Sequence, residues 1–262
     1  GLGRLPDAAV GQKEARAISV DAIVVGAGLA GRVVASTLAA RGLSVVVVDD
    51  GVEPGGSMMG SPGTAEAMTK RYPLDRATLL GCSVAAGVYR GEVLVASDSG
   101  ATVVRARAKV FATGAHDGVL AVPNNDLPGL FSARAVALLA ARGIKPKGRT
   151  AIVGDGFWAD EVAAALGAEH TVRLPIASVV SIKGTSRVRE LFLRDETGAR
   201  TVAVEIVAAA VPGAPSFEVA AQAGAEVRFD AEAGYLVACD ERGRAAKGVW
   251  ATGECTGAAF DP

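Results

Sequence analysis

The sequence has 262 residues, of which 50% are hydrophobic, so it contains enough apolar material for one or two globular domains. Its 27 basic residues nearly balance its 28 acidic residues, and this balance argues against nucleic acid or an anionic membrane surface as a partner. The three cysteines are far apart and form no C-x-x-C motif, which argues against a disulfide framework and a zinc site.

The N-terminal part of the sequence shows no targeting pattern. No apolar run approaches the roughly 18 residues of a membrane span, and the basic-then-apolar layout of a signal peptide is missing. We therefore expect no membrane span and a cytoplasmic location. Because the first residue is Gly1 rather than methionine, we also expect a processed product or a piece of a longer polypeptide. Residues 1–20 lack periodicity and predict an N-terminal arm.

A strand, a glycine turn and a helix are predicted next. Residues 22–25 form an apolar run typical of a buried parallel strand, and Gly26, Gly28 and Gly31 follow with G-x-G-x-x-G spacing. Gly26 permits a sharp turn, Gly28 lets a pyrophosphate approach the backbone, and Gly31 lets the helix pack closely on the strand. This arrangement predicts a dinucleotide at the helix N-terminus.

The residues after the glycine turn support this prediction. A helix over residues 33–40 leads to a second apolar strand at residues 45–48, which ends at Asp49. Asp49 follows Gly26 at about the 20-residue spacing at which an acidic side chain meets the adenosine ribose. Gly55 and Gly56 lie in a turn-rich loop, which we expect to pass near the pyrophosphate.

A strand-rich segment follows this loop. Residues 77–84, 92–97 and 102–108 predict an antiparallel ribbon. The ribbon leads to a short separate strand that ends in Ala-Thr-Gly, and Thr113 and Gly114 of this ending predict a second close approach of the backbone to the ligand.

The same series of elements then recurs, and this internal repeat is the main architectural signal in the sequence. It predicts a linker (123–129), a serine-capped helix (132–141), a strand with a glycine turn (150–156), a helix (159–166), a strand (170–174), two ribbon strands (187–194 and 201–210) and a second Ala-Thr-Gly segment (248–254).

Two glycine-turn units, each with an antiparallel ribbon, and a closing Ala-Thr-Gly-acid segment resemble the flavoproteins that have two dinucleotide-binding domains. The resemblance implies an α/β fold with two Rossmann-like domains of the glutathione-reductase-like FAD/NAD(P) type. It implies a discontinuous FAD-binding domain of residues 21–120 and 228–262. It also implies an inserted, reduced and degenerate NAD(P)-binding-like domain of residues 121–227.

Three short segments, residues 48–56, 112–116 and 124–129, are most similar to the alpha-type subunits of heteromeric sarcosine oxidase. Related alpha-type subunits occur in opine oxidase, dye-linked proline dehydrogenase and hydrogen cyanide synthase. The resemblance implies that a separate beta-type flavoprotein subunit oxidises a small amine or imino acid. The alpha-type subunit would bind a nucleotide and relay electrons or support the redox centre. The implied cofactor is FAD, with NAD or another adenine nucleotide as the alternative in the same cleft.

The resemblance also gives roles to individual residues. Thr113 and Gly114 would line the cleft, and Gly253 with Glu254 would lie where the family usually has Gly-Asp, near the ribityl chain. Glu254 departs from that pattern by one methylene, so the sequence supports binding of the flavin half of the ligand less strongly than binding of the adenosine half. Gly26, Gly28 and Gly31 would contact the pyrophosphate, and Asp49 would contact the ribose. The loop with Gly55 and Gly56 would pass near the pyrophosphate.

The second glycine turn departs further from the family pattern. Ala159 replaces the third glycine, Phe157 and Trp158 are bulky beside the turn, and Asp155 would repel a phosphate. The next strand is followed by Pro175 rather than by an acidic residue. We therefore expect the second domain to keep its fold but to have lost a nicotinamide site.

The sequence identifies no catalytic residue. His116 and His170 have no neighbouring carboxylate or cysteine in sequence that would suggest a catalytic pair. The sequence ends at Pro262, where the family continues into a helix over the flavin, so we expect a missing part or a partner that supplies it. Two alternatives stay open: a self-contained NAD(P)H-dependent FAD oxidoreductase and a non-catalytic, nucleotide-stabilised scaffold subunit.

Overall fold

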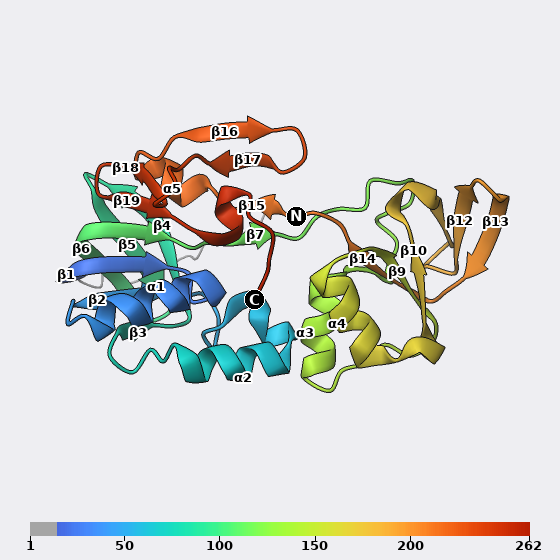
Figure 1. The fold of residues 1–262 in the computed structure, drawn as a ribbon, viewed down its shortest axis with the longest axis horizontal. Helices are drawn as coiled ribbons and strands as arrows, with labels where there is room; N and C mark the ends of the chain where they lie inside the picture. Colours follow the sequence, from blue (N-terminus) through green and yellow to red (C-terminus); the bar gives the residue numbers. More distant parts are fainter. Residues whose placement is uncertain (1–14) are drawn as a thin grey trace, which may run out of the picture.

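A computed structural model describes residues 15–262, which form two α/β units that lie side by side (Figure 1). We call residues 15–116 and 214–262 the first unit and residues 130–210 the second unit. The first unit is built on an eight-stranded sheet with the order β18-β19-β6-β1-β2-β3, to which β5 and β4 are added from β6. Its strands are β1 (Arg16–Val25), β2 (Val45–Val48), β3 (Thr78–Leu80), β4 (Ser83–Tyr89), β5 (Glu92–Ser97), β6 (Gly100–Phe111), β18 (Arg244–Ala246) and β19 (Val249–Ala251).

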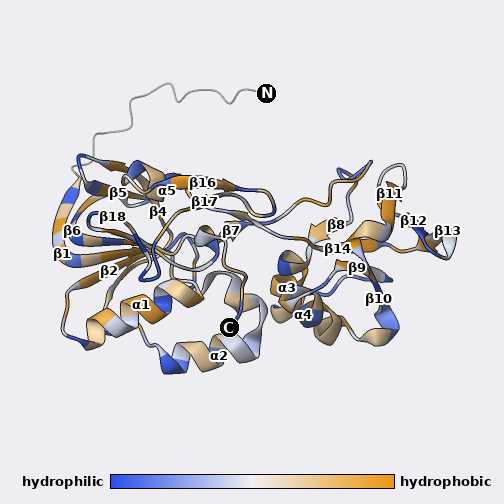
Figure 2. Ribbon diagram, turned by 45° about the horizontal axis from the view of Figure 1, so that its top comes forward, coloured by the Kyte–Doolittle hydropathy of each residue, from blue (hydrophilic) through white to orange (hydrophobic). Residues whose placement is uncertain are grey.

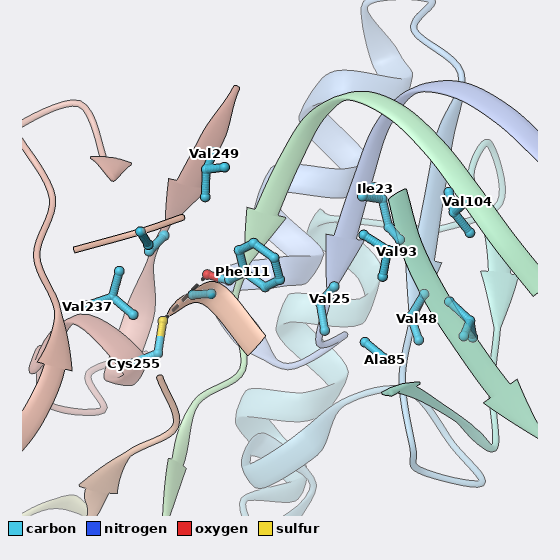
Figure 3. Close-up of a cluster of buried hydrophobic side chains, with 14 of the residues drawn as sticks. Ile23, Val25, Val48, Ala85, Val93, Val104, Phe111, Val237, Val249 and Cys255 are labelled. Carbon is cyan, nitrogen blue, oxygen red and sulfur yellow. Dashed lines mark hydrogen bonds between the residues drawn. The ribbon is translucent and has the colours of Figure 1, made fainter. Parts of the chain in front are cut away.

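The centre of the first sheet is parallel and buried on both faces. All four valines of β2 are buried, as expected for a parallel strand covered on both sides. On one face, Ala35 and Ala39 of α1 (Leu29–Ala40) pack against Val24 and Val47. The other face packs against the ribbon and against α5 (Glu218–Gln222), and Figure 3 shows its core around Phe111.

The second unit repeats this layered plan on a smaller scale. Its parallel sheet has the order β10-β9-β14-β8. One face is covered by two helices and the other by a three-stranded antiparallel sheet. The elements are β8 (Leu130–Ser132), α3 (Ala133–Ala141), β9 (Thr150–Gly154), α4 (Phe157–Leu166), β10 (Thr171–Leu174), β11 (Val179–Lys183), β12 (Glu190–Asp195), β13 (Gly198–Ala203) and β14 (Ile206–Ala210).

Short elements connect the two units and complete the chain. The chain leaves the first unit through β7 and returns through β15, and these two strands pair antiparallel. In both views the C-terminus lies in the space between the units (Figure 1 and Figure 2). The remaining elements are α2 (Pro62–Arg71), β7 (Ala115–His116), β15 (Ala214–Pro215), β16 (Val227–Asp230), β17 (Gly234–Val237) and the 3-10 helices η1 (Gly56–Gly60), η2 (Ala168–His170), η3 (Ile176–Ser178) and η4 (Gly253–Thr256).

The structure corrects several boundaries that we expected from the sequence. The first strand begins at Arg16, so residues 16–20 are not part of an arm, whereas residues 1–14 lie outside the described part of the chain. The reason is that residues 16–20 pair with residues 102–106 of β6. This β6 is one continuous strand, where we expected a ribbon strand and a separate short strand.

Two other segments that we expected as single strands are divided. Residues 77–84 split at Cys82, which has a φ of 47°, into β3 of the parallel sheet and β4 of the ribbon. Residues 201–210 split into β13 and β14, which belong to different sheets. In addition, Ala220 of α5 packs in the core of the first unit, although residues 121–227 were expected in the inserted domain. The other domain boundaries stay predictions.

Candidate functional site: a cleft at the first glycine turn

The carboxyl ends of four parallel strands meet at one edge of the first sheet. Val25 of β1 pairs with Val48 of β2 on one side and with Phe111 of β6 on the other, and Phe111 pairs with Ala251 of β19. Because β1 has the next strand in sequence on one side and a later strand on the other, this edge is a topological switch point, where open α/β sheets bind ligands.

A cavity of about 560 Å³ lies at this edge. Apart from Gly31 and Gly55, all the site residues that we predicted from the sequence line this cavity. They are Gly26, Gly28, Asp49, Gly56, Thr113, Gly114, Gly253 and Glu254. The fold therefore gathers residues from four separate segments of the sequence into one cleft.

The glycine turn is packed too tightly for side chains at two positions and is open at the third. A Cβ at Gly26 would lie 2.2 Å from the carbonyl oxygen of Ala112, and a Cβ at Gly31 would lie 1.9 Å from that of Gly26. At Gly28, by contrast, the nearest atom to a Cβ is the Gly55 oxygen, at 3.9 Å. Gly28 thus leaves room that a ligand can use, whereas Gly31 serves the packing of α1 on β1.

The Gly55–Gly56 loop lies against this turn. A Cβ at Gly56 would lie 3.3 Å from the Cα of Gly28, so the two glycines face each other. Gly28 is the N-cap of α1 and has no side chain that could cap the helix. The first amides of α1 therefore face the cleft with a favourable dipole for an anion.

Asp49 connects β2 to the glycine turn. Its side chain is 8% exposed, and Ala27 N donates a 2.6 Å hydrogen bond to Oδ2. Gly51 N donates to Oδ1 over 3.0 Å. The carboxylate therefore holds the glycine turn in place, and its predicted contact with a ribose stays a prediction.

Arg32 is a buried residue of this region that we did not predict. It is 4% exposed, and its guanidinium donates to the carbonyl oxygens of Tyr72 and Pro54, both over 3.2 Å. Burial lowers the pKa of Arg32, and the nearby Asp49 opposes this shift. The side chain ties the end of α2 and the loop before Gly55 to α1. The sequence feature that could have identified Arg32 is its position as the single charged residue in α1.

Thr113 and Gly114 form a wall of the cleft beside the glycine turn. Gly114 has a φ of 70°, a backbone conformation that favours glycine. The hydroxyl of Thr113 donates a 2.5 Å hydrogen bond to Ser216 O, and Ser216 N donates to Gly114 O over 3.0 Å. The wall is therefore fixed by the segment that returns from the second unit.

Glu254 lies at the end of the cleft that adjoins the second unit, which we call the inner end, and it is paired with a residue of the second unit. Arg134 Nη2 of α3 lies 2.8 Å from Glu254 Oε1, and the two side chains are 14% and 16% exposed. Burial raises the pKa of the Glu254 carboxyl, Arg134 opposes this shift, and Asp117 adds to it. No sequence pattern signals this pair, because its members are 120 residues apart.

The other polar candidates lie outside the cleft. Cys255 is fully buried beside Phe111, as Figure 3 shows, and burial raises the pKa of its thiol. We therefore assign a packing role to Cys255. The His116 ring is 66% exposed and lies 3.9 Å from Glu218. In the described part of the chain, no group of three or more histidines, cysteines and carboxylates is arranged to hold a metal ion.

The glycine turn of the second unit repeats the close approach of the first glycine but differs at the second glycine, since Gly156 has a φ of 96° and Gly28 a φ of −65°. A Cβ at Gly154 would lie 2.2 Å from the Ala210 oxygen, which matches the close approach of Gly26 to Ala112. The ring of Trp158 lies 4.9 Å from those of Phe157 and Phe260. These three rings, together with four carboxylates and one guanidinium, line a cavity of about 370 Å³ beside the turn. The charged residues are Asp117, Arg134, Asp155, Glu232 and Glu254.

Comparison with known proteins agrees with this fold. The alpha subunit of sarcosine oxidase from Corynebacterium sp. (strain P-1) is 33% identical over 146 residues, which cover 45% of this chain and 15% of that protein. The A subunit of opine oxidase from Agrobacterium tumefaciens (strain Ach5) is 32% identical over 161 residues, which cover 52% of this chain and 32% of that protein. The chain therefore matches less than a third of the length of each curated relative.

Solved structures show the same architecture. L-proline dehydrogenase from P. horikoshii superimposes with a TM-score of 0.77 at 24% identity, covering 94% of this chain and 52% of that chain. Lactococcus lactis thioredoxin reductase superimposes with a TM-score of 0.69 at 18% identity, covering 93% and 92%.

No helix in residues 15–262 combines the length and the apolar character that a membrane span requires. The family of pyridine nucleotide-disulphide oxidoreductases matches residues 20–174, a segment that includes the first glycine turn, the ribbon and the second glycine turn. This match covers more than half of the sequence, and the chain therefore belongs to the family of pyridine nucleotide-disulphide oxidoreductases.

Proposed function

We propose that the cleft at the first glycine turn binds FAD and that this chain is the FAD-binding part of an alpha-type subunit in a multi-subunit amine or imino-acid oxidoreductase. The observation that carries the proposal is the facing pair Gly28 and Gly56 at the switch point of the first sheet. The start of α1 lines the cavity at this point, and its first backbone amides and the helix dipole favour an anion there.

The residues around the cleft fit a dinucleotide in both directions from that space. Asp49 lies at the end of β2, where an acidic residue meets the ribose in this class of fold. On the other side, Thr113, Gly114 and Gly253 offer backbone without bulky side chains, and Glu254 offers a carboxylate. When bound, FAD would accept and pass on electrons, while these residues would bind it and orient it.

The side chains around the second glycine turn argue against a self-contained NAD(P)H-dependent enzyme. Carboxylates from both units outnumber cationic groups around the cavity beside the second glycine turn, and a pyrophosphate would be repelled there. Phe157 and Trp158 stand at the start of α4, where a dinucleotide would need its phosphates. We therefore infer that electrons reach this chain from a partner rather than from a nicotinamide bound in the second unit.

Both curated relatives carry names of subunits, the alpha subunit of sarcosine oxidase and the A subunit of opine oxidase. On this basis we propose that the partner is a beta-type flavoprotein subunit and that the substrate of the complex is a small amine or imino acid. Cys82, Cys239 and Cys255 are all free thiols, which fits the reducing cytoplasm that we propose as the location.

The test is to purify the chain, record its visible absorption spectrum, and identify the nucleotide released on denaturation by mass spectrometry. We expect a flavin band and released FAD. A colourless protein that releases NAD or another adenine nucleotide would contradict the FAD assignment and would favour a nucleotide-stabilised scaffold. If FAD is found, the next step is a search for oxidation of amines and imino acids in the presence of a beta-type partner.

A further inference from the structure

A single side chain of the second unit connects three residues that line the cleft of the first unit. The guanidinium of Arg134 donates to Ser57 Oγ over 3.1 Å, to Ala115 O over 3.0 Å and to Glu254 Oε1 over 2.8 Å. Ser57, Ala115 and Glu254 all line the cleft at the first glycine turn, and they come from η1, β7 and η4. Through this guanidinium, the second unit therefore donates hydrogen bonds to three residues that line the cleft.

The position of Arg134 is itself fixed. Its side chain is 14% exposed, and Nε lies 3.3 Å from Asp117 Oδ1. Ser132, the N-cap of α3, donates from its hydroxyl to Asp117 Oδ2 over 2.6 Å. The guanidinium also lies 5.7 Å from the centre of the Trp158 ring. Because contacts surround the planar guanidinium on several sides, Arg134 has little freedom to reorient.

Arg134 also determines how Glu254 faces the cleft. One carboxylate oxygen, Oε1, is bound to Arg134, which leaves Oε2 on the side of Gly114. A Cβ at Gly114 would lie 3.8 Å from Oε2. Since Glu254 lines both cavities, its carboxylate forms part of the wall between them. The free oxygen can accept a hydrogen bond from a hydroxyl group of a molecule that extends past the pyrophosphate position.

We propose that Arg134 is a positioning residue that fixes the inner end of the cleft by holding Ser57, Ala115 and Glu254 together. Through it, the second unit sets the affinity for the half of FAD beyond the pyrophosphate and leaves the adenosine half unaffected. This inference rests on the proposed function, because it assumes that a dinucleotide lies in the cleft.

The charge of Glu254 gives the proposal a pH signature. Burial raises the pKa of Glu254, and Arg134 is the group that lowers it. Loss of the Arg134 charge therefore raises this pKa further, and Glu254 becomes protonated at a higher pH. The charged groups that contact Glu254 or share a cavity with it are Arg134, Asp117, Asp155, Glu232, Asp49, Asp50 and Asp261.

The experiment compares FAD with ADP, which lacks the flavin half, as titrants of the nucleotide-free protein in a calorimeter. We expect R134Q to weaken FAD binding by roughly tenfold, the effect of one lost charge-assisted hydrogen bond. ADP affinity should change by less than about twofold, since ADP ends at the phosphates. R134K should restore part of the FAD affinity, because lysine keeps the charge without the planar fork.

The control is R142Q, which removes an exposed arginine just after the same helix and should leave both affinities unchanged. As the pH is lowered, FAD affinity should decline in both proteins. This decline should begin at a higher pH in R134Q than in the wild type. Equal losses for FAD and ADP would show a merely structural role and would overturn the proposal, as would unchanged FAD affinity in R134Q. If R134Q does not fold, R134K with the same two titrants decides.

Failure of the proposed function would look different. In that case the wild-type protein would not bind FAD, whether or not it binds ADP, and no variant could weaken FAD binding further. Wild-type binding of FAD without any selective loss in R134Q would leave the proposed function standing and would overturn only the role of Arg134.

Discussion

The two glycine turns of this protein share the backbone of their first glycine but differ at the second glycine, where φ is −65° for Gly28 and 96° for Gly156, and in the side chains around them. Gly26 approaches the Ala112 oxygen, and Gly154 approaches the Ala210 oxygen, at the same spacing. A Cβ has room at the second glycine of either turn, at Gly28 with the Gly55 oxygen 3.9 Å away and at Gly156 with no atom within 4 Å, but Phe157 and Trp158 follow directly after the second turn. The repeated element is therefore the strand, the close approach of the first glycine and the helix, and we infer that the neighbouring side chains decide whether such a turn can hold a dinucleotide.

The largest effect is expected at Gly31, the third glycine position of the first turn. Gly31→Ala would place a Cβ 1.9 Å from the Gly26 oxygen, so the backbone must move. We expect a loss of about 1–3 kcal/mol in the free energy of unfolding, as for overpacked cores, and a loss of bound nucleotide. Thermal unfolding followed by circular dichroism measures the first effect, and the absorption spectrum measures the second.

The matched control lies at the corresponding position of the second unit, where Ala159 is buried and already tolerated. Ala159→Gly should cost about 1 kcal/mol through helix propensity alone and should leave nucleotide content unchanged. Equal effects of the two substitutions on nucleotide content would contradict the assignment of the ligand to the first turn.

The next largest effect is expected at the end of β2, which carries Asp49 in the first unit. Asp49→Ala should weaken ADP binding by roughly 10- to 100-fold, because a charged hydrogen bond to the ribose and the support of Ala27 N are both lost. Asp49→Asn keeps an acceptor for Ala27 N and should show a smaller loss. Calorimetric titration with ADP decides, and wild-type affinity in Asp49→Ala would rule out the ribose contact.

Much of this comparison could be predicted from local sequence, because it depends on backbone. The four valines of β2 end where the apolar run ends, and Ser132 caps α3 as its position before an apolar helix predicts. Gly26 and Gly28 were identifiable because their spacing reflects requirements of the turn itself. These features involve neighbours within a few residues in sequence, where propensity and pattern are informative.

The features that the sequence did not reveal depend on contacts between distant segments. Arg134 meets Glu254 across 120 residues, and neither residue type signals the other. The extension of β1 to Arg16 depends on pairing with β6, whose full length was also missed. Residues 17–20 alternate between exposed and partly buried, a short pattern that forms a strand only because β6 pairs with it.

A smaller effect should appear in the pH dependence of stability. Burial raises the folded-state pKa of Glu254, so its contribution to stability is present below the unfolded pKa and is lost as the pH rises through the folded pKa. The stability of Glu254→Gln relative to wild type should therefore be more favourable at pH 7 than at pH 4. Melting temperatures of both proteins across this range give the answer, and a difference with the opposite sign would contradict the raised pKa.

The smallest expected effect concerns the second unit directly. We expect NADH to produce no useful rate of flavin reduction in the isolated protein, because carboxylates and aromatic rings surround the second turn. Anaerobic stopped-flow mixing with NADH, with dithionite as the positive control, measures this rate. Rapid bleaching of the flavin band by NADH would show that the second unit retains a working nicotinamide site.

The central claim is that the open space at Gly28 is the place where a dinucleotide binds, and Gly28→Val tests it most directly. The Gly28 backbone has a φ of −65°, and a Cβ there would meet only the Gly55 oxygen at 3.9 Å, so the variant should fold. The valine methyl groups would then occupy the cleft. We predict an unchanged circular dichroism spectrum with FAD binding weakened at least roughly 100-fold, since a blocked phosphate site loses several charge-assisted hydrogen bonds. A folded Gly28→Val protein that binds FAD with wild-type affinity would contradict the account.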